Sequence, residues 1–286
     1  MAEVQIRQGT AEDAPECARI FFDAFESIAT RHAFPIEPGS PEYCAVRMNS
    51  LLSSPGIAGL VAEQGGDIVG SAFADERGAI VGIGPVSVDP AAQDGGIGRA
   101  LMQALLERER RRDVAGVRLV QTAYHYRSFS LYAKLGFAVR EPLSVFQGMP
   151  DAPPTPGAVV RPATPDDLQR CDDICRQVHG YDRHAELQEW INAGTARVVE
   201  RNAAITGYAT GLGYGWHAVG ESDDDITALL GAAENFLGLG ILVPSRNAAL
   251  MAWCLTAGLR LVQQSTLMTT GFYREPQGAY LPSILY

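Results

Sequence analysis

The sequence predicts an α/β protein of two related domains, each a mixed, mostly antiparallel sheet flanked by helices. Three observations support this prediction: segments of the first half recur in the second, a strand meander precedes alternating strands and helices, and a proline-rich segment separates the two copies. The 286 residues are sufficient for two domains with substantial cores.

The repeat is clearest at the start of each half. At an offset of 154 residues, the first set recurs as the second: Arg7, Thr10, Asp13 and Cys17, then Arg161, Thr164, Asp167 and Cys171. Each set fits a short strand, a threonine at the N-cap and then a helix. Two more pairings align residues 63–72 with 200–209 and residues 125–137 with 247–259.

A stiff linker is predicted between the copies. Residues 148–157, "GMPDAPPTPG", contain four prolines in ten residues, a composition typical of an extended connection. We therefore predict a first domain at 1–147, a linker at 148–157 and a second domain at 158–286.

The elements of the first domain follow from periodicity and turn residues. After the first strand we predict helices at 11–29 and 41–52, and then strands at 59–63, 68–74 and 79–88. The remaining elements alternate: helix 97–112, strand 117–123, helix 128–135 and strand 137–146. This order predicts a mixed sheet with helices on both faces.

Composition and charge argue against some classes of function and partner. Hydrophobic residues make up 47% of the chain, and the formal net charge of −10 argues against a broad basic surface for nucleic acid. No apolar run reaches the ~18 residues that a membrane helix needs, and the first residues lack the pattern of a secretory signal. We expect a cytoplasmic protein with neither nucleic acid nor membrane as a partner. The oligomeric state is left open, a homodimer included.

The five cysteines are odd in number, scattered and without CxxC spacing, which indicates a reduced chain. Cys171, Cys175 and His179 are each four residues apart and would share one helix face. Metal ligation is one interpretation of this spacing; we favour burial of packed side chains and expect no metal.

Three glycines stand where the strand at 79–88 gives way to a helix, in "QDGGIGRAL". A helix N-terminus offers unpaired N–H groups and a partial positive charge. Gly95, Gly96 and Gly98 would leave these groups uncovered, and Arg99 adds a cation. The pattern predicts a phosphate-binding turn. It lacks the Lys-Ser/Thr pair of a P-loop and the third glycine of a dinucleotide-binding fingerprint.

This segment, "VSVDPAAQDGGIGRALM", resembles the pyrophosphate-binding motif of the GNAT N-acetyltransferases, with Gln93, Gly96 and Gly98 at its fixed positions. Downstream, "HYRSFSLYAKLGF" resembles a second segment of that superfamily, and the positions in register are Ser128, Leu131, Tyr132, Lys134, Gly136 and Phe137. Both occur in the family's order, with a strand between them. The resemblance covers residues 4–146 and, more faintly, the second half. It implies a tandem GNAT protein with acetyl-CoA as co-substrate.

The resemblance also implies site residues. The backbone of residues 86–88 would pair with the pantetheine arm, and amides from Gly95 to Arg99 would hold the pyrophosphate. The implied cofactor-binding set is Val86, Ser87, Val88, Gln93, Asp94, Gly95, Gly96, Ile97, Gly98, Arg99, His125, Ser128 and Tyr132. Tyr132 would lie beside the thioester sulfur as the general acid, since a phenol with a pKa of about 10 can protonate the leaving thiolate.

His125 stands where the family usually has asparagine. Its role stays open between a cofactor hydrogen bond, a general base and a helix cap. The strand at 79–88 has no carboxylate, although many relatives place a general base there. The base is therefore unassigned, and its candidates are Glu26, His32, Asp75, His125 or a chain of waters.

Residues 24–35 lie where the superfamily builds its acceptor pocket, so the resemblance implies that Phe25, Glu26 and His32 face the substrate.

The second domain lacks the cofactor motif. Asp223, Asp224 and Asp225 stand at the start of its central helix and would repel a pyrophosphate. Cys254 takes the place of Tyr132, and we expect it to be a packed, unreactive thiol. This domain is predicted to keep the fold, lose the cofactor and wall the acceptor site, through residues 213–220 or 271–286.

The resulting hypothesis is an acetyl-CoA-dependent N-acetyltransferase with one working site, in the N-terminal half. Its acceptor would be an amine of a small molecule or peptide. The alternative is a non-catalytic CoA-binding sensor or scaffold, which the missing carboxylate supports and Tyr132 opposes. A third interpretation, a dinucleotide-dependent oxidoreductase, rests on Gly96 and Gly98 alone.

Overall fold

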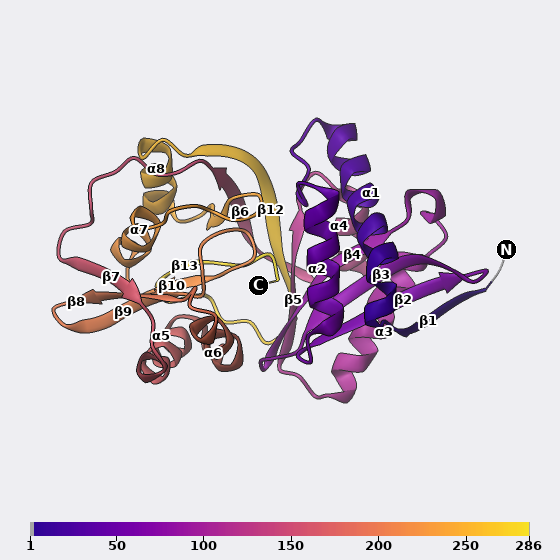
Figure 1. The fold of residues 1–286 in the computed structure, drawn as a ribbon, viewed down its shortest axis with the longest axis horizontal. Helices are drawn as coiled ribbons and strands as arrows, with labels where there is room; N and C mark the ends of the chain where they lie inside the picture. Colours follow the sequence, from indigo (N-terminus) through magenta and orange to yellow (C-terminus); the bar gives the residue numbers. More distant parts are fainter. Residues whose placement is uncertain (1–2, 286) are drawn as a thin grey trace.

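The computed structural model describes residues 3–285 and places the two halves of the chain side by side (Figure 1). The elements of the N-terminal half are β1 (Val4–Gln8), α1 (Ala14–His32), α2 (Pro41–Ser53), β2 (Ile57–Gln64), β3 (Asp67–Asp75), β4 (Ile80–Val88), α3 (Ile97–Arg111), β5 (Gly116–Thr122), α4 (Tyr126–Lys134) and β6 (Ala138–Gln147). Every element predicted for this half is present, with bounds that differ by a few residues. The predicted start of the first helix, residues 11–13, is a separate 3₁₀ turn.

The C-terminal half repeats this order and then adds one strand. Its elements are β7 (Ala158–Pro162), α5 (Leu168–His179), α6 (His184–Asn192), β8 (Arg197–Arg201), β9 (Ala204–Ala209), β10 (Ala218–Gly220), α7 (Asp223–Gly231), β11 (Ile241–Pro244), α8 (Ala248–Thr256), β12 (Arg260–Gly271) and β13 (Ala279–Leu281). Within residues 3–285, none of the helices combines the length and the apolar character that crossing a bilayer would take.

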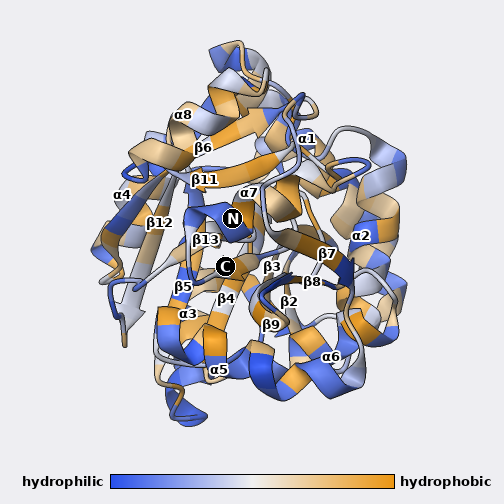
Figure 2. Cartoon of the chain, turned by 90° about the vertical axis from the view of Figure 1, so that its left-hand side faces the viewer, coloured by the Kyte–Doolittle hydropathy of each residue, from blue (hydrophilic) through white to orange (hydrophobic). Residues whose placement is uncertain are grey.

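Both faces of each sheet are covered, because successive strand residues point to opposite sides. In β2, Leu60 and Ala62 pack with α3 and α4, whereas Val61 packs with α1 and α2. In the other half, Val198 packs toward α5 and α6 and Val199 toward α7 and α8. β11, which is buried throughout, is accordingly hydrophobic along its length (Figure 2).

The two halves exchange strands. The larger sheet has the order β1-β2-β3-β4-β5-β12-β6-β11, and the smaller has the order β13-β10-β9-β8-β7. β12 of the C-terminal half therefore lies between β5 and β6 of the N-terminal half, and β6 in turn pairs with β11. The ranges 1–147 and 158–286 describe the repeat in the sequence, while the larger sheet combines strands of both halves and the smaller sheet contains strands of the C-terminal half alone.

The cysteine–histidine face of α5 is buried. Cys171 and Cys175 are fully enclosed in the core between α5 and the smaller sheet, and His179 lies between the rings of Tyr181 and Tyr280. In the part of the chain that the structure describes, no three His, Cys, Asp or Glu side chains are grouped as metal ligands.

The sequence repeat is reproduced in a pair of matching ion pairs. The Arg7 guanidinium donates to both Asp13 oxygens, at 2.8 and 2.9 Å, and to Glu63 at 2.8 Å. Arg161 binds both oxygens of Asp167 in the same way, at 2.7 and 2.8 Å. The bond to Arg7 lowers the pKa of Asp13 to about 2. Each pair ties the first strand of a half to the turn that starts its first helix.

We expect Asp13→Asn to lower the free energy of unfolding by about 1–2 kcal/mol near neutral pH. Because the folded pKa of Asp13 lies below its unfolded value, its stabilisation is full above about pH 4 and declines as the pH falls toward 2. Urea unfolding at several pH values, with Glu12→Gln as the exposed control, measures this. A deficit that stays constant between about pH 6 and pH 3 would contradict it.

Candidate active site

A cavity of about 420 Å³ opens where β4 and β5 separate. These parallel strands pair only from Ile80 to Gly82 with Gly116 to Arg118. Beyond Gly82 they diverge, while the other edge of β4 continues to pair with β3 as far as Val88. The edge of β4 that faces β5 therefore keeps backbone N–H and C=O groups available to a ligand in the cavity.

One end of the cavity is the uncapped start of α3. Gly96 is the N-cap residue, with φ of +82°, and no side chain caps this helix. Gly98 faces a narrow gap, because a Cβ there would lie 3.6 Å from Val88 and 3.8 Å from Leu131. Glycines thus keep the space between β4, α3 and α4 clear, and the first N–H groups of α3 remain open to an anion.

The structure brings almost all the predicted cofactor residues to this cavity. Those that line it are Val86, Ser87, Val88, Gln93, Asp94, Gly96, Ile97, Gly98, Arg99, His125, Ser128 and Tyr132. Gly95 is in the same turn but does not line the cavity. The Gln93 amide donates to the carbonyl of Val88 at 3.2 Å, which ties the glycine turn to the end of β4.

Tyr132 and His125 are both uncharged near neutral pH. Burial raises the pKa of Tyr132 to about 12, so its phenol stays protonated. Burial lowers the pKa of His125 to about 4, so its imidazole is neutral and only weakly basic. His125 is the N-cap residue of α4, as one of its open interpretations had it, but its side chain makes no capping hydrogen bond. Its backbone carbonyl accepts from the Ser128 hydroxyl at 2.9 Å.

Of the three residues predicted to face the acceptor, one lines the cavity. Phe25 lines the cavity and packs edge-on against Phe21, with ring centroids 4.9 Å apart. Glu26 and His32 do not line it, and both are exposed, so the structure does not bring these two predicted residues to this cavity. Glu26 is one position beyond Phe25 and therefore points away from the sheet. His32 lies against the ring of Tyr124, at 5.5 Å.

Asp75, another candidate base, is bound to the Arg77 guanidinium at 2.8 Å and does not line the cavity. Two carboxylates do line it: Asp94 in the glycine turn and Glu37 in the connection between α1 and α2. Glu37 lies away from the glycine turn, and its Oε1 accepts from the Thr122 hydroxyl at 2.6 Å and from the Gln263 amide at 2.9 Å. Burial raises the pKa of Glu37 above its usual range.

Sequence analysis missed Glu37 because it belongs to no motif. The one local signal is its place in "FPIEPGS", an acidic residue in a segment stiffened by Pro35 and Pro38. Its partner Gln263 lies 226 residues away, on the exchanged strand β12.

The C-terminal half forms one wall of the cavity. Tyr214 and Gly215 contribute from the segment 213–220, and Ile284 and Leu285 from the last residues. The tail passes so close to β4 that a Cβ on Gly82 would meet the carbonyl oxygen of Leu285. Both segments expected to wall the site do so.

The C-terminal half fills its own equivalent of this site. At an offset of 137 residues, β3 matches β9, and the pairing of Gly70 with Val88 recurs as that of Gly207 with Gly220. Residues 218–220 therefore correspond to residues 86–88. Their outer edge is occupied by β13, which pairs with them residue for residue.

In addition, the N-terminus of α7, the helix that follows residues 218–220, is not available to bind an anion. The Asp225 carboxylate caps α7 by accepting from the backbone N–H and the hydroxyl of Ser222, each at 2.9 Å. Cys254, which stands in the place of Tyr132, is fully buried, and burial raises its pKa to about 12. As expected, it is a packed and unreactive thiol.

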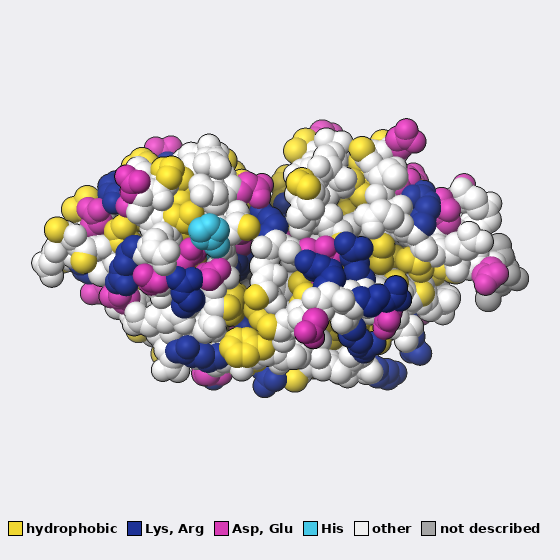
Figure 3. All heavy atoms as spheres, turned by 90° about the horizontal axis from the view of Figure 1, so that it is seen from below, with side chains coloured by type: hydrophobic (Ala, Val, Ile, Leu, Met, Phe, Trp, Pro, Cys, Tyr) yellow, Lys and Arg dark blue, Asp and Glu magenta, His cyan; other side chains and the backbone are white. Residues whose placement is uncertain are grey.

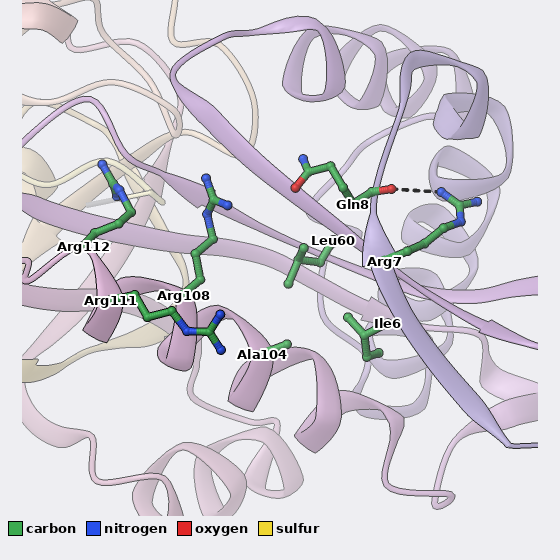
Figure 4. A pocket seen from close by; sticks show the side chains of 8 residues that line it. All are labelled: Ile6, Arg7, Gln8, Leu60, Ala104, Arg108, Arg111 and Arg112. Atoms are coloured by element: carbon green, nitrogen blue, oxygen red, sulfur yellow. Dashed lines mark hydrogen bonds between the residues drawn. The ribbon is translucent and has the colours of Figure 1, made fainter.

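A second hollow lies over β1, β2 and α3 (Figure 4), on a side of the N-terminal half where arginines gather (Figure 3). It is lined by Arg7, Arg108, Arg111 and Arg112 together with Ile6, Gln8, Leu60 and Ala104. Each of these arginines is paired with a carboxylate, in the order Asp13, Glu76, Glu107 and Glu109. The hollow is thus a neutralised surface.

The comparison with protein families finds one match, in the first half. The model of the acetyltransferase (GNAT) domain matches residues 55–139, which run from the start of β2 into β6 and include the glycine turn and α4. This stretch of the N-terminal half is similar to a GNAT acetyltransferase domain. GNAT acetyltransferases use acetyl-CoA, which is therefore the co-substrate of this domain.

Solved structures extend the likeness to the whole chain. A putative acetyltransferase from Pyrococcus horikoshii is 23% identical, with a TM-score of 0.74 over 96% of this chain and 94% of that one. A GCN5-related N-acetyltransferase from Sphaerobacter thermophilus is 14% identical, with a TM-score of 0.64 over 95% and 96%. A tandem GNAT protein from the clavulanic acid biosynthesis pathway is 16% identical, with a TM-score of 0.58 over 94% and 98%. The chain thus has the tandem GNAT fold. No curated protein sequence matches it.

We expect Gly96→Glu to raise the Kd for acetyl-CoA about 100-fold, because a carboxylate would stand at the helix terminus where the pyrophosphate is expected. Gly194→Glu is the matched control: its φ of +75° resembles that of Gly96, its Cβ position is equally free of neighbours, and it lies far from the cavity. Isothermal titration measures both variants. Equal affinities would show that this turn does not bind the cofactor.

Proposed function

We propose that this chain is an acetyl-CoA-dependent N-acetyltransferase that transfers acetyl directly to an amine of a small molecule or peptide. The observation that carries the proposal is the continuity of the cavity. The uncapped start of α3, the open edge of β4 and Tyr132 all border one space. An acetyl-CoA molecule bound along the start of α3 and the edge of β4 would have its thioester beside Tyr132.

In this proposal the backbone binds most of the donor. The groups of Val86, Ser87 and Val88 that face away from β3 pair with the pantetheine arm as an added strand would. The first N–H groups of α3 bind the pyrophosphate, and Arg99 adds a positive charge beside them.

The transfer then proceeds without a covalent enzyme intermediate. The amine nitrogen attacks the thioester carbonyl, and a backbone N–H near residues 86–88 stabilises the oxyanion that develops. Collapse of the tetrahedral intermediate breaks the C–S bond, and the Tyr132 phenol protonates the departing thiolate. Its pKa of about 12 ensures that the proton is present at neutral pH.

The second candidate, a non-catalytic CoA-binding sensor, drew its support from the absence of a carboxylate on β4. Glu37 supplies a carboxylate to the same cavity from another segment, which removes that support. All five cysteines are free and buried, which supports a reducing compartment, the cytoplasm, as the place of action.

We expect Tyr132→Phe to lower kcat by about 10²–10³ while the Kd for acetyl-CoA stays unchanged, because only proton transfer to the thiolate is lost. Tyr126→Phe, on the same helix with the ring 73% exposed, is the control and keeps wild-type turnover. Thiol release with a panel of amines gives kcat, and isothermal titration gives the Kd. Tight binding of acetyl-CoA by wild type without turnover of any amine would favour the sensor instead.

A further inference from the structure

Away from the glycine turn, the cavity is lined by the carboxylate of Glu37 and by the guanidiniums of Arg47 and Arg31, the latter exposed on α1. Glu37 accepts hydrogen bonds from Thr122 and Gln263, and the Tyr214 phenol interacts with the same carboxyl group as a further neutral donor. The other titratable group beside it is the phenol of Tyr124. Arg47, on α2, lines the same cavity and is partly buried. Across residues 3–285, no ion pair joins Glu37 or Arg47 to an opposite charge.

Arg47 lies too far from the glycine turn to serve the pyrophosphate. The charges that act on it are those of Asp75 and Arg77, which bind each other. Asp75 pairs with Gly82 of β4, and the glycine turn follows the strand's other end at Val88. Six residues of strand span about 20 Å. Arg47 is therefore a cation of the part of the cavity away from the glycine turn.

Enclosing the charges of Glu37 and Arg47 without a ligand costs free energy. Enclosing a carboxylate or a guanidinium without an opposite charge loses hydration that nothing in the protein replaces. A ligand that carries an ammonium and an anion would neutralise both groups at once. The same cavity also has aromatic lining residues, among them Phe25, Tyr43 and Tyr214.

Glu37 is also placed to act as a base. The hydrogen bonds from Thr122 and Gln263 both end on Oε1, which leaves Oε2 to accept a proton from a ligand beside the Tyr214 phenol. Its raised pKa makes it a stronger base than an exposed glutamate, and the free carboxylate predominates once the pH exceeds that pKa.

We propose that the acceptor is a small molecule with both a primary amine and a carboxylate, bound with its amine at Glu37 and its carboxylate at Arg47. The inference rests on the acetyl transfer proposed above. Glu37 takes one proton from the ammonium, and the free amine forms the C–N bond as the C–S bond breaks. Tyr132 protonates the thiolate, and the second proton of the nitrogen restores the phenol through solvent.

The first test compares matched acceptors. Thiol release is measured with the standard L-amino acids, β-alanine and γ-aminobutyrate, each beside its carboxamide and its decarboxylated amine. At least one amino carboxylate is expected to exceed its own carboxamide by about 30-fold or more in kcat/KM, since the amide cannot pair with a guanidinium. Turnover of neutral amines with no preference for the carboxylate overturns the inference and leaves the acetyltransferase standing.

The second test assigns the preference to Arg47. Arg47→Gln is expected to raise KM for the preferred amino carboxylate about 30-fold and to leave its carboxamide within about threefold, with Arg47→Lys in between. Arg111→Gln, an exposed arginine on α3 outside the cavity, is the control. An equal loss for both acceptors would mean that Arg47 is merely structural, and would refute its role.

The third test addresses Glu37 through pH. In wild type, kcat falls as the pH drops through the raised pKa of Glu37, because the protonated carboxyl cannot accept the amine's proton. Glu37→Gln is expected to lose this acidic limb and to lower kcat about 100-fold or more, while Glu12→Gln keeps the wild-type profile. An unchanged limb in Glu37→Gln would exclude it as the base.

Titration of acetyl-CoA into each variant distinguishes a failure of the proposed function from a failure of the proposed acceptor class. Wild type, Arg47→Gln and Glu37→Gln are all expected to bind acetyl-CoA with the same Kd, which also reports that they are folded. If wild type does not bind acetyl-CoA, the proposed function fails. If it binds the donor but turns over no amino carboxylate, the acceptor class proposed here is wrong.

Discussion

The separation of β4 from β5 after three paired residues is the constraint on which the rest of the site depends. Two parallel strands that stayed paired would satisfy each other's backbone groups and leave no room between them. Their divergence creates at once an open backbone edge, a cavity and a route from the start of α3 to the helix that carries Tyr132. In the proposed function, the side chains at the site add charge and proton transfer to a binding surface that is largely backbone.

The two halves show what becomes of the same architecture when this edge is closed. In the C-terminal half, β13 pairs along β10, and Asp225 caps α7 from within. In the N-terminal half, the equivalent edge is free and Gly96 leaves α3 uncapped. The duplicated half therefore supports the site from outside: Tyr214 and Leu285 form its wall, and Gln263 holds Glu37.

Sequence reasoning succeeded where the determinants are local. The glycine turn and Tyr132 belong to contiguous motifs, and their partners are fixed by the strand–turn–helix that contains them. Glu26 does not line the cavity because one residue on a helix changes direction by about 100°. Glu37 went unnoticed because its environment depends on distant residues. The strand exchange was equally invisible, since a buried strand has the same pattern whichever neighbour it pairs with.

The exchanged strand has a consequence for how the chain reaches its native state. β12 pairs with β5 across 143 positions of sequence, as in Ser265 with Thr122. The first half therefore leaves the ribosome with the β5 edge unsatisfied, and Glu37 lacks one of its two donors until nearly the whole chain has been made. Contacts of such long sequence separation form late and slowly, and an open edge invites pairing with other chains in the meantime. The cavity of the N-terminal half is completed only when synthesis of the C-terminal half is almost finished, so a product truncated before β12 lacks a wall and a strand of the proposed site.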